Sequence, residues 1–158
     1  MTDTDQKTPS RRNTRTVGRI GEDAACAWLE ANGFRIVDRN VYAGGCEADI
    51  LAENDTHFIF AEVKTRREHP EHPDRFGRPA NAVTAAKRTH MLTMARAYLR
   101  DHPEVLETRS PRLDVIEVYL SPEPMPPGSD ASPTVLEVLH FPDAVRERPN
   151  YARTRKPY

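Results

Sequence analysis

The sequence contains few of the residues that build disulfide frameworks, zinc sites or membrane spans. Only two of its 158 residues are cysteines, and because Cys26 and Cys46 are not in a CxxC pair, we expect neither a disulfide framework nor a zinc site. The amino-terminal stretch is polar, and no uninterrupted apolar run approaches the roughly 20 residues that a transmembrane helix needs. The sequence also lacks the strand-turn-helix motif that presents a nucleophilic serine. These absences predict a soluble, cytoplasmic protein outside the serine and cysteine hydrolases.

Histidines with metal-binding spacing are missing as well. His69 and His72 lie among prolines without partnering cysteines, which is typical of solvated loop residues. The other four histidines, among them His140, show no spacing that points to a shared site. We therefore expect no histidine-based metal site.

A net charge of one sign is also absent, because 23 basic and 24 acidic residues give a net charge of −1. The charges are nevertheless unevenly distributed. Residues 1–19 and 142–158 each carry five basic and two acidic groups, residues 64–78 carry five basic and three acidic groups, and all other residues together have a net charge of −9. An acidic body with basic ends and one basic loop is typical of a protein that holds cations internally and phosphates at its periphery. The alternative for the two ends is that disordered tails are often charged.

The length and composition predict one domain with a single core, because 37% of the residues are hydrophobic. Fourteen prolines indicate that a good part of the chain is loop or tail. We therefore expect a disordered basic arm at 1–16, a single domain at 17–142 and a basic flexible tail at 143–158.

Hydrophobic periodicity predicts two helices and five strands within this domain. Apolar residues recur with helical spacing at 17–31 and 82–100. β-Branched and aromatic residues are dense in five shorter stretches, at 34–39, 46–52, 57–64, 112–120 and 134–141. The segments 65–79 and 121–133 are rich in proline and read as loops. Periodicity alone therefore gives a mixed α/β domain, without its topology.

Four charged side chains lie on the second and third of these strands. Residues two apart in a strand share a face, so Glu47 projects with Asp49, and Glu62 projects with Lys64. If the strands form a hairpin, both pairs can lie on one face, where the acids repel each other unless a cation neutralises them. Mg²⁺ is the natural candidate, because it takes oxygen ligands from one or two carboxylates and completes its shell with water and phosphate. The pattern therefore predicts a magnesium site on this hairpin.

The spacing of Asp49 and Glu62-Val63-Lys64 resembles the PD-(D/E)xK signature of restriction-endonuclease-like nucleases. More of the chain, from residue 18 to residue 142, resembles the YraN-like family of small bacterial proteins within that superfamily. The matching segments are GRIGE at 18–22, RN at 39–40, GCEADILA at 45–52, FAEVKTR at 60–66, Lys87 and RLDVI at 112–116. Cys46 and Ala48 depart from the family pattern, at positions that affect local backbone and packing. As a set the segments are specific, whereas Glu-x-Lys alone would mean little.

The resemblance implies both a fold and a mechanism. The fold is the αβββαβ core of restriction-endonuclease-like proteins, a mixed β-sheet flanked by helices. Asp49 and Glu62 would bind Mg²⁺ or Mn²⁺ together with the backbone carbonyl of Val63, and Lys64 would orient or help deprotonate the attacking water. A second metal could lie near Glu47 or Glu22. The candidate catalytic residues are Asp49, Glu62, Lys64, Glu22 and Glu47.

Two of the residues in the matching segments also have simpler explanations. Glu22 lies in the early turns of the first helix, where the helix dipole favours a carboxylate, whereas the resemblance places it beside the active site. Lys87 lies on the apolar stripe of the second helix, where a lysine can snorkel from the core edge, whereas the resemblance favours a phosphate contact. The other candidate nucleic-acid contacts lie in a basic loop that could close over the substrate: Arg66, Arg67, Arg75 and Arg78.

These features predict a metal-dependent nuclease that hydrolyses phosphodiester bonds in DNA, with branched or junction DNA among the candidate substrates. Related junction resolvases act as dimers, which leaves a homodimer open. The alternative is a protein on a nuclease fold that binds nucleic acid or a partner without turnover. Clustered carboxylates argue against a pure binder, because they repel phosphate. A metal-stabilised structural domain would explain the acids but not Lys64 or the basic loop.

Overall fold

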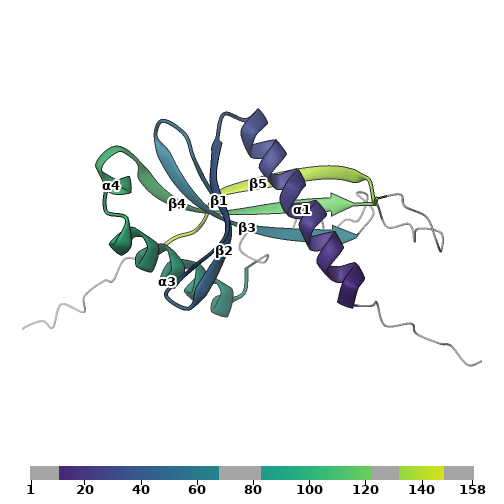
Figure 1. The fold of residues 1–158 in the computed structure, drawn as a ribbon, viewed down its shortest axis with the longest axis horizontal. Coiled ribbons are helices and arrows are strands. Elements are labelled where there is room, and N and C mark those ends of the chain that lie inside the picture. The colour runs from purple at the N-terminus through teal and green to yellow at the C-terminus, as the bar shows by residue number, and fades with distance from the viewer. Residues whose placement is uncertain (1–10, 68–82, 122–131, 148–158) are drawn as a thin grey trace, which may run out of the picture.

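The computed structural model describes residues 11–67, 83–121 and 132–147, which form one five-stranded sheet flanked by helices (Figure 1). The elements in chain order are α1 (Arg11–Ala31), β1 (Arg35–Ala43), β2 (Cys46–Glu53), β3 (His57–Arg67), α3 (Ala85–Asp101), α4 (Val105–Thr108), β4 (Ser110–Leu120) and β5 (Val135–Val145). None of the helices described is both long and apolar enough to cross a bilayer.

The sheet is mixed, and its strand order is β1-β2-β3-β4-β5. Antiparallel pairing joins β1 to β2, β2 to β3, and β4 to β5, whereas β3 and β4 run parallel. Parallel neighbours need a crossover connection, and α3 lies in the chain between these two strands. This order of elements confirms the predicted αβββαβ architecture and is consistent with a restriction-endonuclease-like core.

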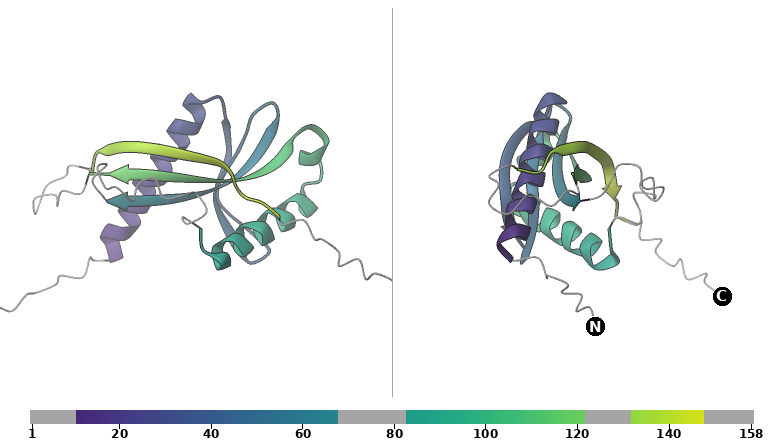
Figure 2. Two further views of the ribbon diagram at one scale, coloured as in Figure 1. Left: turned by 180° about the vertical axis from the view of Figure 1, so that it is seen from behind. Right: turned by 90° about the vertical axis from the view of Figure 1, so that its right-hand side faces the viewer.

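The two long helices cover opposite faces of the sheet. Helix α1 crosses in front of the strands in Figure 1 and behind them in the left view of Figure 2. Its Ala25 and Leu29 pack against Ile50, Ile59 and Ile116, whereas the α3 face holds a separate buried cluster that includes Phe60, Met94 and Val115. Successive residues of a strand point to opposite faces. The alternation therefore decides which charged residues share a face with α3.

Several element boundaries differ from the predicted ones. Helix α1 begins at Arg11, so residues 11–16 belong to a helix rather than to the predicted disordered arm. These residues are polar and show no apolar periodicity, which is why the pattern did not indicate a helix. Strand β5 ends at Val145, beyond the predicted domain end at residue 142. The arm and tail themselves stay predictions, because 1–10 and 148–158 lie outside the described residues.

Strand β3 is also longer than predicted, and it includes residues 65–67, which were assigned to the basic loop. Parallel pairing with β4 continues to the end of the strand, where Arg67 lies opposite Leu120. A neighbouring strand that is distant in the sequence therefore extends β3 past the point where its own hydrophobic pattern ends. The short helix α4 was not predicted.

Helix α1 approaches β3 very closely at one glycine. A Cβ atom built on Gly21 would lie 1.8 Å from Oγ1 of Thr65, a separation that real atoms cannot adopt. Only a residue without a side chain allows this approach. The contact places the second glycine of the GRIGE segment beside Thr65, the residue that follows Lys64.

Candidate active site

Asp49 and Glu62 lie where β2 and β3 stop pairing. The last pair of the β2–β3 ladder is Ile50 with Ala61, so Asp49 and Glu62 occupy the next positions on the two strands. In place of a ladder bond, the Val63 N–H donates a hydrogen bond to Oδ2 of Asp49 at 2.7 Å. Glu62 faces α3, as does Phe60 on the same strand, and the charge of Asp49 acts on Lys87 of that helix. The structure thus brings the two predicted acids together at a fork in the sheet.

The two carboxylates disfavour each other's charge. Burial raises the pKa of Asp49 to about 7, and the negative charge of Glu62 adds to this effect, while the Val63 N–H acts in the opposite direction. Without a bound cation, Asp49 therefore keeps a proton until near-neutral pH. A divalent cation would supply the positive charge that this proton now provides.

Lys87 supplies one positive charge to the same site. Its Nζ lies 2.8 Å from Oε2 of Glu62. Thr84 caps α3 by accepting a hydrogen bond from the Lys87 N–H, which places the lysine in the first turn of the helix. Burial alone would lower the pKa of Lys87, but the hydrogen bond to Glu62 and the charges of Glu62, Asp49 and Glu47 raise it. The resemblance suggested a phosphate contact for Lys87, and in this structure its partner is a carboxylate.

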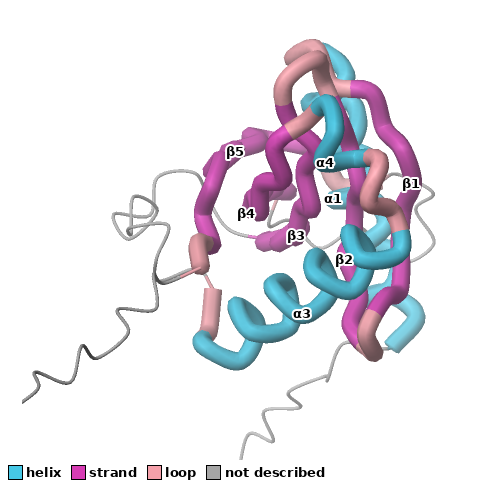
Figure 3. The backbone as a smooth tube through the Cα atoms, turned by 90° about the vertical axis from the view of Figure 1, so that its left-hand side faces the viewer, coloured by secondary structure: helices cyan, strands magenta, loops and turns pink. Residues whose placement is uncertain are grey.

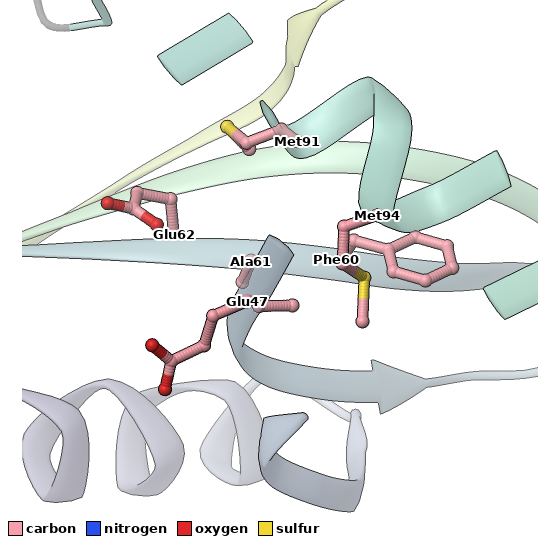
Figure 4. Close-up of a pocket in the computed structure, with 7 residues that line it drawn as sticks. Glu47, Phe60, Ala61, Glu62, Met91 and Met94 are labelled. Atoms are coloured by element: carbon pink, nitrogen blue, oxygen red, sulfur yellow. The ribbon is translucent and has the colours of Figure 1, made fainter. Parts of the chain in front are cut away.

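A small pocket adjoins the acidic pair, and it is lined by Glu47, Ala48, Phe60, Ala61, Glu62, Met91 and Met94. Figure 4 shows the carboxylates of Glu47 and Glu62 at the same end of this pocket, away from the Phe60 ring. Phe60 and the two methionines form its apolar wall. The pocket therefore has one acidic and one apolar end.

Lys64 lies on β3 two residues after Glu62. The pairing of β3 with β4 runs without a register shift from His57 to Arg67, so Glu62 and Lys64 share a face as predicted. Lys64 is opposite Glu117 of β4 in this register. The predicted alternation of acid and lysine along the strand is thus present.

The donor groups at the fork fit a hard divalent cation. In an extended strand the N–H and C=O of one residue point to the same edge, so the Val63 carbonyl points to the same side as the N–H that binds Asp49. Two carboxylates and one carbonyl match the oxygen ligands that Mg²⁺ and Mn²⁺ prefer, and they leave positions for water and a phosphate. No group of three or more acidic, histidine or cysteine side chains that could hold a metal occurs within residues 11–67, 83–121 and 132–147. A cation here would therefore rely on Asp49, Glu62 and Val63.

Glu22 lies in a different, open hollow between α1 and β1. Its Oε2 accepts hydrogen bonds from Nη2 of Arg39 and Nδ2 of Asn40, each at 3.2 Å. Asn40 has a φ of 51°, which a non-glycine residue rarely adopts. The RN segment at 39–40 thus holds a carboxylate of the GRIGE segment. A direct catalytic role for Glu22 stays a prediction.

The predicted nucleic-acid contacts are only partly within the described residues. Arg66 lies on β3, and its Nη2 is 3.7 Å from Oε1 of Glu117, which is 5% exposed. Oε2 of Glu117 accepts a hydrogen bond from the Tyr119 hydroxyl at 2.7 Å. Arg67 ends β3, whereas Arg75 and Arg78 lie outside the described residues. Part of the charge of Arg66 is therefore matched within the protein.

A buried polar cluster around Asp114 was missed in the sequence. Nε and Nη2 of Arg112 each donate to the Asp114 carboxylate at 2.8 Å, and Nε2 of His140 lies 2.7 Å from its Oδ2. Burial alone would raise the pKa of Asp114, but the hydrogen bonds from His140, Arg112 and the Asp143 N–H lower it. Arginine and aspartate two apart on β4 were a weak signal, and His140 belongs to another strand. The cluster joins β4 to β5 and lies apart from the fork.

Comparison with known proteins identifies the family. A family model described as "Uncharacterised protein family UPF0102" matches residues 21–118. The chain belongs to the UPF0102 family. This confirms the YraN-like resemblance, and the matched range contains the fork residues, Glu22, Lys87 and Asp114.

Several UPF0102 relatives match most of their own length. The protein of Symbiobacterium thermophilum is 41% identical over 112 residues, which is 70% of this chain and 87% of the relative. That of Syntrophotalea carbinolica is 39% identical over 129 residues, 82% of this chain and 90% of the relative. Among solved structures, Pyrococcus furiosus SfsA in complex with Ca²⁺ is 20% identical and covers 66% of this chain and 58% of its own, with a TM-score of 0.29. A likeness this low carries no argument about the site.

Proposed function

We propose that this UPF0102 protein is a Mg²⁺-dependent nuclease that hydrolyses phosphodiester bonds in DNA. The observation that supports it most is the carboxylate pair Asp49 and Glu62 at the end of the β2–β3 ladder, with the Val63 backbone beside it. Burial and the charge of Glu62 raise the pKa of Asp49, and a bound cation would offset both effects, which supports the proposal. Proteins retain such an arrangement where it serves a function, because a structural role does not need two crowded acids.

In the proposed mechanism, the chain holds the cation and positions the nucleophile. Asp49, Glu62 and the Val63 carbonyl would hold Mg²⁺, which would supply Lewis-acid stabilisation of the charge on the scissile phosphate. Lys64 projects from the same strand face as Glu62 and would donate a hydrogen bond that orients the attacking water. Lys87 pairs with Glu62 in the absence of a cation and would present its ammonium to the substrate phosphate.

The experiment that tests this proposal is a panel of labelled DNA and RNA structures, incubated with Mg²⁺, Mn²⁺ or EDTA. We expect cleavage that requires metal, and we expect Lys64→Ala to lower its rate on the order of 10²-fold or more, as is usual when a water-orienting residue is lost. Nucleic-acid binding by Lys64→Ala should stay close to that of the wild type, because phosphate contacts are distributed over the surface.

Arg100→Ala is the matched control for the loss of one positive charge. Arg100 is exposed near the end of α3 and pairs with Asp101, so this variant should cleave like the wild type. Equal rates for Lys64→Ala and the wild type would contradict the role of Lys64. The proposed function would be contradicted by cleavage that does not require metal, or by the absence of cleavage on every substrate of the panel.

One observation favours a second candidate, a nucleic-acid-binding protein without turnover. Glu62 already has a cationic partner within the protein, the Lys87 ammonium at 2.8 Å. A site completed in this way would bind nucleic acid equally well in EDTA and would cleave none of the panel. The same experiment therefore separates the two functions.

A further inference from the structure

Tyr42 is an exposed aromatic residue close to the candidate active site. It lies near the end of β1, and 72% of its surface is accessible to solvent. A single exposed aromatic residue is common on protein surfaces, so its meaning depends on its neighbours. Its position relative to the fork can be derived from the strand register.

The register places Tyr42 beside Glu47. The two residues are directly opposite in the antiparallel β1–β2 ladder, so their side chains share a face and lie next to each other. The Glu47 carboxylate beside the Tyr42 hydroxyl raises the pKa of the phenol, and the charge of Asp49 adds a smaller effect. Glu47 in turn lines the pocket that contains Glu62. Tyr42 is therefore the cross-strand neighbour of a residue at the acidic end of this pocket.

The hairpin that carries Tyr42 is held in place by α3. Gly44, in the turn between β1 and β2, has a φ of +60°, and a Cβ built on it would lie 2.9 Å from the Cβ of Ala97. The turn therefore packs directly on α3, and Figure 3 shows it next to that helix. Because α3 also carries Lys87, the ring and the acidic pair are positioned by the same helix. The backbone that carries Tyr42 is thus held in place by this packing.

The ring faces are left available by these contacts. Tyr42 is 72% exposed, and the aromatic pairs within the described residues do not include it. An aromatic side chain with open faces on a well-positioned strand is suited to stacking. Nucleobases stack on such rings independently of sequence, because every base has a π-face.

We propose that Tyr42 stacks on an unpaired nucleobase next to the scissile phosphate, so that the substrate is single-stranded or branched DNA rather than continuous duplex. Both faces of a base inside a duplex are already stacked on its neighbours, whereas a base at a branch or in a single strand has a free face. This inference rests on the proposed function, because it takes the fork of Asp49 and Glu62 as the place where the phosphate lies.

The test measures binding without cleavage, using the full chain in Ca²⁺ and again in EDTA. One probe is a DNA duplex with a single-stranded arm that carries 2-aminopurine at its first unpaired position, and the other is a fully paired duplex of equal length with the same label. Wild-type protein should prefer the armed probe and quench its fluorescence by stacking. Tyr42→Ala should reduce affinity for the armed probe roughly 5- to 100-fold and abolish the quench, with little change on the duplex.

Two further variants make the test specific. Tyr42→Phe keeps the ring but loses the hydroxyl, so it should retain both the preference and the quench. Leu106→Ala removes another exposed apolar side chain, from α4, and should behave as the wild type. Melting curves check that each variant is folded, which we expect because the side chain of Tyr42 is mostly in solvent.

Three outcomes would overturn the inference. If Tyr42→Ala binds and quenches as the wild type does, the ring does not stack. If Tyr42→Phe fails like Tyr42→Ala, the hydroxyl rather than the ring is responsible. In both cases nucleic-acid binding itself persists, so the proposed function survives. If the wild type binds neither probe, the proposed function and the inference fail together.

Discussion

Replacing Asp49 by Asn tests the acidic fork most directly. The substitution removes one negative charge, while the Asn side chain has nearly the same shape and keeps an oxygen that can accept the Val63 N–H. It also removes the repulsion with Glu62 that contributes to the raised pKa of Asp49. We therefore expect Asp49→Asn to stabilise the metal-free protein, although it removes a candidate catalytic residue.

The size of the effect follows from the pKa of Asp49, which rises from 3.8 to about 7 on folding. Since one pKa unit corresponds to about 1.4 kcal/mol, the ionised carboxylate destabilises the folded state by at most ~4 kcal/mol, and partial exposure lowers this to ~2–4 kcal/mol. The folded state binds the proton more tightly, so stability falls as the pH rises from 3.8 to about 7 and the penalty is complete above that range. For a chain of this size, Asp49→Asn should raise Tm by roughly 5–15 °C at pH ~8, and it should have little effect at pH ~4.

Divalent metal should reverse the order of stability. A cation that binds the folded state stabilises the wild type by mass action, whereas Asp49→Asn lacks a ligand and should respond much less. Thermal melting of both proteins in EDTA and in Mn²⁺ measures this directly. Asp101→Asn is the control, because Asp101 is an exposed aspartate at the end of α3, and this variant should match the wild type in every condition. Two results would contradict this account of the fork. One is a lower Tm for Asp49→Asn than for the wild type in EDTA at pH ~8, and the other is an equal rise in Tm for both proteins on adding Mn²⁺.

Two further predictions concern the packing that supports the site. Gly21→Ala should cost ~1–3 kcal/mol of stability, because its Cβ would overlap Oγ1 of Thr65. Adding Thr65→Ala should recover part of this loss, and additive losses of the two variants in urea unfolding would contradict the contact. Asp114→Ala should lower the free energy of unfolding by ~3–5 kcal/mol, because it leaves the Arg112 and His140 side chains without their buried partner. If this variant unfolds in urea with wild-type stability, the cluster does not hold β4 to β5.

The local pattern of the sequence was sufficient for the strands of the site. Alternation along CEADILA and FAEVK predicted that Glu47 shares a strand face with Asp49, and that Glu62 shares one with Lys64. The uninterrupted register of β3 agrees with this for Glu62 and Lys64. Such predictions succeed because the two-residue period of a strand is a local property of the backbone. The topology came from the family resemblance, which implied the αβββαβ core that the sheet has.

The partners of these residues were not predictable in the same way. The end of the β2–β3 ladder at Ile50 and Ala61 depends on how the sheet splays, and the contact between Lys87 and Glu62 depends on where α3 packs. Glu22 was expected beside the active site, and its observed partners Arg39 and Asn40 come from the far strand β1. None of these distances follows from a spacing in the sequence.

The sequence by itself thus determined the two long helices, the five strands and which residues of β3 share a face, because these follow from hydrophobic periodicity. Only the tertiary structure decided which charges meet. It joined Asp49 to Val63, gave Lys87 to Glu62, and assembled the Asp114 cluster from two strands. The physical reason is that electrostatic and hydrogen-bonding partners are selected by distances of a few ångströms between segments far apart in the chain, and packing alone sets those distances.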